Sequence, residues 1–210
     1  MKKNKTAAFL LVFFILLSAA FMAYYYRTTR EQPKVLPTVG NPGHTIDPFA
    51  FTNQDGKTVT EKDVAGKVFV VEYFFTTCKG ICPKMNENMT KVYQAFRGNK
   101  DVMILSHTVD PQKDTVQAMK AYSLRFDADP AQWEFLTGDK KDLYDHARHS
   151  YLVTAVDDTA TVDIQSDFIH TNRFMLVDRN GHIRGGYDGT DIGSVNQLIG
   201  DIKILLNEKS

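Results

Sequence analysis

The sequence predicts an α/β domain that follows one apolar N-terminal segment. Two largely apolar runs, 68–75 and 102–109, alternate with apolar patterns of helical period, as in sheets of parallel strands. An Asn180-Gly181 pair between two apolar stretches adds a C-terminal β-hairpin. The 25 basic residues balance the 25 acidic ones without forming a basic stripe, so we expect no nucleic-acid partner.

The N-terminal segment is predicted to be a membrane anchor. No charged residue lies between Lys5 and Arg27, and about 20 apolar residues in a helix span the hydrocarbon core of a bilayer. We therefore predict one transmembrane helix over about residues 7–26, within an anchor segment 1–30. A cleaved signal peptide is the alternative, because small residues at 18–20 follow an apolar run.

The lysines before this segment indicate its orientation. Lys2, Lys3 and Lys5 favour a cytoplasmic N-terminus. We therefore expect a single-pass inner-membrane protein whose C-terminal domain lies in a bacterial periplasm. That compartment is oxidising, so two cysteines can rest there as a disulfide.

A linker and a hairpin come next. Residues 31–45 are rich in proline and glycine and predict a tether before a domain that covers 46–208. Within the domain, residues 49–60 are typical of a short hairpin that turns at Asp55-Gly56. The run 68–75 that follows is apolar at every position except one, which is typical of a strand buried on both faces.

Helical and extended patterns alternate through the rest of the domain. Pro83 suits the start of a helix, which the spacing of the following apolar residues continues. The later elements are a strand over 102–109, a helix over 116–126, a short strand over 133–136, a helix capped by Asp139, a hairpin of 173–178 with 182–187, and a helix over 192–206.

This order of elements is that of a thioredoxin-like domain. The prediction is a thioredoxin-like fold with an N-terminal hairpin extension, preceded by one transmembrane helix. One segment does not fit the minimal plan. Residues 154–169 are polar and acidic, and we interpret them as an inserted loop.

Both cysteines of the chain lie in one short stretch, FFTTCKGICPKMN. Cys78 and Cys82 are separated by three residues and followed by Pro83. They are expected in the loop between a parallel strand and a helix, at the edge of the sheet where α/β proteins place their sites. The positive end of the helix dipole is expected to lower the pKa of both thiols.

Three interpretations of the cysteine pair remain open. A structural disulfide would close a loop too small to constrain the unfolded chain much. A redox pair is favoured by the location, although thioredoxin-type motifs have two intervening residues and this chain has three. Metal ligation is the third, because two thiolates select soft ions such as Cu(I), with an imidazole to complete the site.

Among the six histidines, His170 is the best placed to join the cysteines. It directly precedes the predicted strand 173–178, at a point that lies beside the cysteine loop in a thioredoxin-like sheet. His107 lies within a predicted strand and is a minor candidate. The others are not expected to contribute: His44 lies in the tether, His146 and His149 on a solvated helix face, and His182 after an exposed turn.

Four stretches together carry a resemblance to a known family. They are FFTTCKGICPKMN, VDPQKDT at 109–115, FLTGDKKDLYDHARHSY and DFIHTNRFMLVDRNGHI. In this order they resemble the Sco/SenC proteins over roughly residues 45–205. The resemblance implies a membrane-tethered thioredoxin-like domain that binds copper and helps assemble the dinuclear copper centre of cytochrome c oxidase.

The resemblance also implies roles for single residues. Matched position by position, the copper ligands are Cys78, Cys82 and His170, and Asp110 is an acidic residue beside the ligands. The implied partner is the copper-bearing subunit of cytochrome c oxidase or another periplasmic cysteine protein.

Two other functions stay open. The first is a thiol–disulfide oxidoreductase that reduces the cysteines of a partner without carrying copper, so enzymatic activity is not decided. The second is a peroxidase-like enzyme, which needs one activated cysteine and a cationic stabiliser, for which Arg173 is the candidate.

Overall fold

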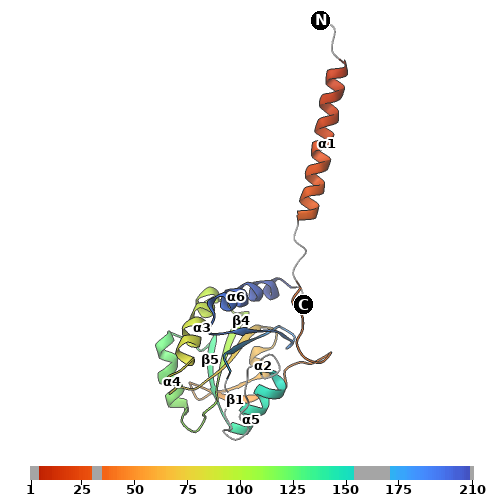
Figure 1. The fold of residues 1–210 in the computed structure, drawn as a ribbon. Helices are drawn as coiled ribbons and strands as arrows, with labels where there is room; N and C mark the ends of the chain where they lie inside the picture. Colours follow the sequence, from red (N-terminus) through yellow and green to blue (C-terminus); the bar gives the residue numbers. More distant parts are fainter. Residues whose placement is uncertain (1–4, 30–34, 154–170, 209–210) are drawn as a thin grey trace. The chain divides into compact units, whose positions relative to one another are not determined.

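The computed structural model describes residues 5–29, 35–153 and 171–208. His170 and the predicted inserted loop 154–169 lie outside the described residues. The chain divides into two compact units, Met1–Val35 and Leu36–Ser210, which are considered separately (Figure 1).

The first unit contains helix α1, Lys5–Thr29. Its segment Ala8–Arg27 is long and apolar enough to cross a membrane, by length and composition. The predicted N-terminal helix is therefore confirmed as a helix. Its length and composition are equally those of a signal sequence.

The second unit is built on one sheet. Seven described strands have the order β2-β1-β5-β4-β3-β6-β7. Their bounds are β1 Ala50–Asn53, β2 Thr58–Thr60, β3 Val68–Phe74, β4 Val102–Thr108, β5 Trp133–Thr137, β6 Arg173–Val177 and β7 Ile183–Asp188. The three central strands β5, β4 and β3 are parallel, and an antiparallel hairpin lies at each edge. The predicted α/β class and both hairpins are confirmed.

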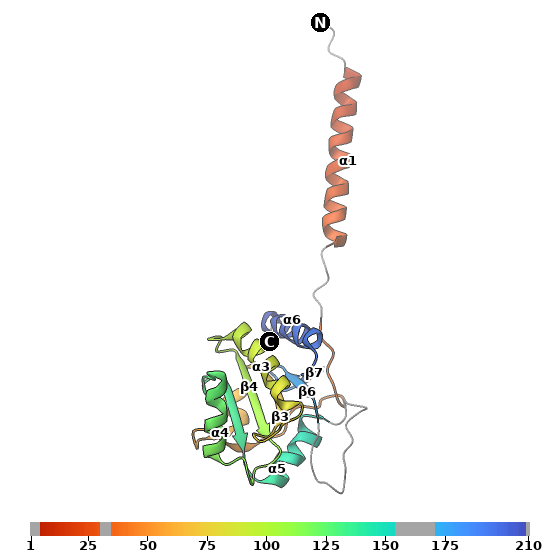
Figure 2. The same ribbon diagram turned by 60° about the vertical axis from the view of Figure 1, so that its left-hand side comes forward.

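Helices cover both faces of this sheet (Figures 1 and 2). Their bounds are α2 Glu61–Val64, α3 Cys82–Phe96, α4 Val116–Ser123 with a 3₁₀ turn to Phe126, α5 Lys140–Asp145 with a π-helical turn to Ser150, and α6 Ile192–Asn207. Apolar residues of α3, α4 and α6 share one core cluster. Those of α2 and α5 share the other. Helix α3 begins one residue before the predicted start, so Pro83 is its second residue.

Strand β3 contributes to both cores, because successive side chains of a strand point to opposite faces. Val70 and Phe74 pack on the side of α3, whereas Val71 and Tyr73 pack on the side of α5. All seven residues of β3 are buried. The predicted doubly buried strand is confirmed, and it includes one charged residue, Glu72.

Residues 36–45, expected to belong to the linker, pack along the second unit. They form no helix or strand, but Leu36 is only 4% exposed. The Val39 amide donates to the Ile183 carbonyl at 2.8 Å. The Arg184 guanidinium donates to the Leu36 carbonyl at 2.7 Å, which fixes this segment against β7.

Candidate metal centre

The two cysteines lie where β3 passes into α3, as predicted. Both thiols are free; Cys78 is half-buried in the loop, and Cys82 is buried as the first residue of α3. Both cysteines line the same cavity. A pair of free thiols therefore lies at the carboxyl end of a parallel strand, the usual place for a site in such a sheet.

The expected lowering of the thiol pKa is wrong for Cys82. Burial raises the pKa of the Cys82 thiol to about 12, and the neighbouring Cys78 thiol adds to this increase. Burial disfavours the charged thiolate more strongly than the start of α3 favours it. Cys82 is therefore a protonated thiol at neutral pH, and its proton must leave when the sulfur binds a metal.

A cavity of about 320 Å³ opens at the cysteines. Its walls are largely apolar and include Tyr73, Ile81 and Val109. Thr171, the described residue next to His170, also lines it. Within the described ranges, no three His, Cys, Asp or Glu side chains are grouped to hold a metal ion, so the cysteine pair supplies two of the donors that a metal needs.

Asp114 holds the cysteine loop in place, and sequence reasoning missed it. Its fully buried carboxylate accepts hydrogen bonds from the Thr76 amide, the Thr76 hydroxyl and the Thr108 hydroxyl. It thereby ties the loop after β3 to the end of β4. Asp114 lies in the VDPQKDT stretch, but its partner Thr76 comes from a loop far away in the sequence, so the stretch alone does not indicate its role.

Asp110 lies at the end of β4, one residue after the cavity-lining Val109. Its carboxylate pairs with Lys113 at 2.9 Å, and its amide donates to the Thr108 hydroxyl. Asp110 itself does not line the cysteine cavity.

His107 lies in the core, away from the cysteine cavity. It is fully buried and its ring stacks on Tyr73 with centroids 5.1 Å apart. Burial lowers the pKa of His107 to about 3, so the ring is neutral. Backbone groups of Leu105 and Glu72 lie near it, but neither ring nitrogen has a partner in hydrogen-bond geometry.

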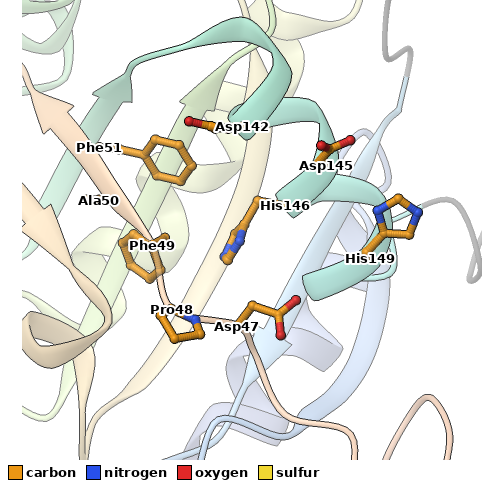
Figure 3. Close-up of a pocket in the computed structure, with 9 residues that line it drawn as sticks. All are labelled: Asp47, Pro48, Phe49, Ala50, Phe51, Asp142, Asp145, His146 and His149. Carbon is orange, nitrogen blue, oxygen red and sulfur yellow. The ribbon is translucent and has the colours of Figure 1, made fainter.

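A second cavity, of about 430 Å³, lies beside α5 (Figure 3). Asp47, Asp142, Asp145, His146 and His149 line it together with residues 48–51. The expectation of a solvated face is wrong for His146, which is 7% exposed. Its Nε2 atom lies 3.1 Å from the Ser150 hydroxyl, within the π-helical turn. Burial lowers the pKa of His146 to about 4.

The structure also tests the expectations for three further residues. His149 is exposed, as predicted. His182 is only partly exposed, because its ring lies 3.4 Å from the Asp178 carboxylate. Arg173 begins β6 and does not line the cysteine cavity, so the cation named for the peroxidase-like interpretation is not among its described lining residues; the basic residue that lines the cavity is Lys79.

Residues 38–207 match the family model described as SCO1/SenC. The chain belongs to the SCO1/SenC family. It is 30% identical over 160 residues to the SCO1 protein homolog of Bacillus subtilis (strain 168), which covers 75% of this chain and 81% of that protein.

Two solved structures of Sco proteins are similar to this fold. One is BsSco, described as a member of the Sco family of cytochrome c oxidase assembly proteins with a disulfide switch. It has a TM-score of 0.67 and 28% identity, and covers 85% of this chain and 100% of its own. The other is ScoI of Bradyrhizobium japonicum with copper bound. Its TM-score is 0.60 and its identity 26%, over 77% of this chain and 99% of its own. The thioredoxin-like prediction agrees with these neighbours.

Proposed function

We propose that this SCO1/SenC protein binds one copper ion through Cys78, Cys82 and His170 and delivers it to, or prepares, the dinuclear copper site of cytochrome c oxidase. The observation that carries the proposal is the pair of free, adjacent thiols in a single cavity. Copper bound in ScoI of Bradyrhizobium japonicum and the oxidase-assembly role stated for BsSco support it.

Two cysteine sulfurs and one histidine nitrogen are suitable ligands for copper. Thiolates are soft ligands that favour Cu(I), and an imidazole nitrogen also makes Cu(II) acceptable. The apolar walls of the cavity limit access of water to the sulfurs. Thr171 on the cavity wall supports His170 as the third ligand, because adjacent residues are less than about 4 Å apart along the chain.

Copper stoichiometry tests the proposal. The full chain in detergent, reduced and handled without oxygen, should retain one copper against a modest chelator. Cys78→Ala should abolish retention, and His170→Ala should weaken Cu(II) binding and change its absorption spectrum. His182→Ala is the matched histidine control and should bind as the wild type does. Unchanged Cu(II) affinity and spectrum in His170→Ala would remove His170 from the site.

A second function is favoured by the unequal exposure of the two sulfurs. Cys78 is half-buried and Cys82 is buried, so a partner's disulfide reaches Cys78 first. The Cys78 thiolate would attack that disulfide to form a mixed disulfide, and the Cys82 thiolate would then release the reduced partner. Cys82→Ser should trap the mixed disulfide through Cys78. If no such species forms in cells, this function is excluded.

We also propose that α1 remains as a single-pass anchor in the inner membrane, with the second unit in the periplasm. The support is the length and apolar composition of Ala8–Arg27 and the lysines that precede it. Protease added to intact spheroplasts should digest the second unit, and the mature chain should keep its N-terminal methionine peptide.

A further inference from the structure

The cavity of about 430 Å³ beside α5 serves neither proposed function. It lies between residues 47–51 and the helical segment 142–149 (Figure 3). The cysteines line a different cavity. Small-molecule sites in proteins are clefts of about 300–1,000 Å³, so this cavity has the size of a binding site.

His146 is a buried polar side chain that faces this cavity. It is only 7% exposed, and Figure 3 shows its ring between Phe49 and Asp47. Its Nε2 atom lies 3.1 Å from the Ser150 hydroxyl. Its Nδ1 atom has no hydrogen-bond partner among the described residues and is not sealed from solvent. Because His146 lines the cavity, this nitrogen is available to a ligand there.

Hydrogen bonds hold the walls of the cavity together. The segment His146–Ser150 is a π-helical turn, and such turns are rare and lie frequently at functional sites. The Ser150 hydroxyl also accepts a hydrogen bond from the Asp47 amide at 2.8 Å. The His44 Nε2 atom lies 2.8 Å from the Ser150 carbonyl oxygen. The segment before β1 is therefore joined to the turn after α5, and the cavity is a fixed part of the domain.

The acidic side chains at the cavity carry charge that its other lining residues do not balance. Asp47, Asp142 and Asp145 line it. Asp145 pairs with Lys141 at 2.6 Å. The carboxylates of Asp47 and Asp142 have no ion pair and no side-chain hydrogen bond with a described residue. Among the described residues that line the cavity there is no lysine or arginine.

Two basic side chains of this region are engaged outside the cavity. Lys140 and Arg148 lie over the Tyr144 ring, 5.3 and 5.5 Å from its centroid, and Tyr144 does not line the cavity. Burial lowers the pKa of His146 to about 4, so its ring is neutral near pH 7. The cavity is therefore negatively charged at neutral pH.

Aromatic rings form the wall beside these carboxylates. Phe49 and Phe51 stack with centroids 5.6 Å apart, and they lie 5.3 and 5.8 Å from the His146 ring. Carboxylates bind organic cations through charge-assisted hydrogen bonds, and aromatic rings attract the same cations. A bare metal ion needs more closely grouped donors, and within the described ranges no three His, Cys, Asp or Glu side chains are grouped in that way.

We propose that this cavity binds an organic cation with an alkylammonium or alkylguanidinium head group, the chemistry of a lysine or arginine side chain. The Asp47 and Asp142 carboxylates accept hydrogen bonds from the cation, and the Phe49 ring packs against it. The Ser150 hydroxyl can accept from the Nε2–H group of His146, which leaves Nδ1 as a further acceptor. The site is separate from the cysteines, so the inference does not rest on the copper function.

Calorimetry with two matched probes tests the need for charge. Butylguanidinium is titrated near pH 7 into the full chain in detergent, without copper, and butylurea is its uncharged analogue of the same shape. The wild type should bind butylguanidinium saturably and should not bind butylurea. Asp47→Asn and Asp142→Asn should each weaken binding by about fivefold or more, because each removes a charged acceptor. Both side chains are exposed, so these variants keep the fold.

A third variant separates a local site from the general charge of the protein. Glu87→Gln removes an exposed carboxylate from α3, which packs on the opposite face of the sheet, and it should bind butylguanidinium as the wild type does. Equal weakening in Glu87→Gln, equal binding of butylurea, or no saturable binding of butylguanidinium would overturn the inference. Each of these outcomes leaves the copper proposal intact.

The NMR signals of the histidine rings locate the bound cation. Butylguanidinium should shift the ring signals of His146 and leave those of His182, between β6 and β7, unchanged. A capped Gly-Arg-Gly tripeptide that binds more tightly than butylguanidinium supports a cation carried by a partner protein, whereas weaker binding of the tripeptide supports a free small molecule. Shifts of the His146 ring that appear with Zn²⁺ and not with butylguanidinium would overturn the inference.

Discussion

At the scale of single residues, burial sets the direction of the pKa shift of three groups in the core, Cys82, Glu72 and His107. Cys82 lies at the start of a helix, yet burial dominates and its thiol pKa is raised. The buried Glu72 has a raised pKa and the buried His107 a lowered one, for the same reason. Each neutral form is favoured because a low-dielectric interior disfavours charge.

His107 gives a prediction with a defined pH dependence. His107→Phe should raise the free energy of unfolding by about 1 kcal/mol near neutral pH, because it removes two unpaired buried nitrogens. The folded pKa of His107 is lowered to about 3, so the unfolded chain alone takes up a proton as the pH falls through about 6.5. The wild type thus loses stability there, and the advantage of the variant should grow.

Urea denaturation at several pH values measures this difference. His149→Phe, at an exposed position, is the control and should leave the stability nearly unchanged. A variant whose stability stays at or below that of the wild type at every pH would show that the unpaired ring nitrogens of His107 do not destabilise the folded domain.

The two aspartates of the VDPQKDT stretch give a matched pair. The Asp114 carboxylate accepts hydrogen bonds with both of its oxygens. In Asp114→Asn one of these oxygens becomes an NH₂ group, which is itself a donor and faces the donors of Thr76 or Thr108. It should cost roughly 2 kcal/mol of unfolding free energy and weaken copper retention by loosening the cysteine loop. Asp110→Asn removes one ion pair with an exposed lysine and should cost less than about 0.5 kcal/mol. Equal losses in the two variants would contradict the assigned anchoring role of Asp114.

The cysteine pair was predictable from the sequence because its position depends only on the preceding strand and the following proline. The role of Asp114 was not, because it depends on which side chains two separate loops bring together. The surroundings of Glu72 were not predictable either, because a single acidic residue within an apolar run does not indicate which groups of other strands face it.

At the scale of elements, two glycines differ in the room around them: a side chain at one would clash with its neighbours, whereas a side chain at the other would not. A Cβ atom at Gly189 would lie 2.6 Å from the Phe174 ring and 3.0 Å from the Asn172 carbonyl, whereas a Cβ at Gly200 in α6 meets nothing within 4 Å. The first glycine is required where the end of β7 approaches the entry to β6. The second is replaceable.

Alanine substitutions at these positions should therefore have opposite effects. Gly189→Ala should destabilise the domain by about 1–3 kcal/mol, because the strand entry beside Thr171 must shift. Gly200→Ala should stabilise it by about 0.5–1 kcal/mol through helix propensity. Thermal unfolding of both variants checks the signs, and a loss in Gly200→Ala would show that α6 packs more tightly than described.

The spacing of apolar residues predicted most of the helices and strands, and the features that it did not predict have physical causes. Strands β3 and β4 were predictable because both of their faces are buried, which makes most of their residues apolar even though buried polar residues such as Glu72 and Ser106 remain in them. The π-helical turn after α5 was not readable, since it shifts the helical register and turns His146 inward. A regular helix pattern cannot show such a shift.

At the scale of the whole molecule, the second unit starts earlier than composition suggests. A chain that begins at residue 35 should fold with the stability of the full second unit, because it keeps Leu36 and its contact with Arg184. A chain that begins at residue 47 should be less stable by about 2 kcal/mol or more, since it exposes apolar surface and leaves part of a buried guanidinium unpaired. Urea denaturation of the two truncated chains compares them. Equal stability would mean that residues 36–46 are only a tether.

The hydrogen bonds around Glu72 end at the chain's single tryptophan. The Trp133 indole donates to the Ser106 hydroxyl at 2.8 Å, and that hydroxyl donates to Glu72. Because indole emission responds to charges within a few ångströms, the protein carries its own optical reporter at this position. Fluorescence recorded through a pH titration would then report a change in the charge of Glu72, without a label and in the unmodified chain.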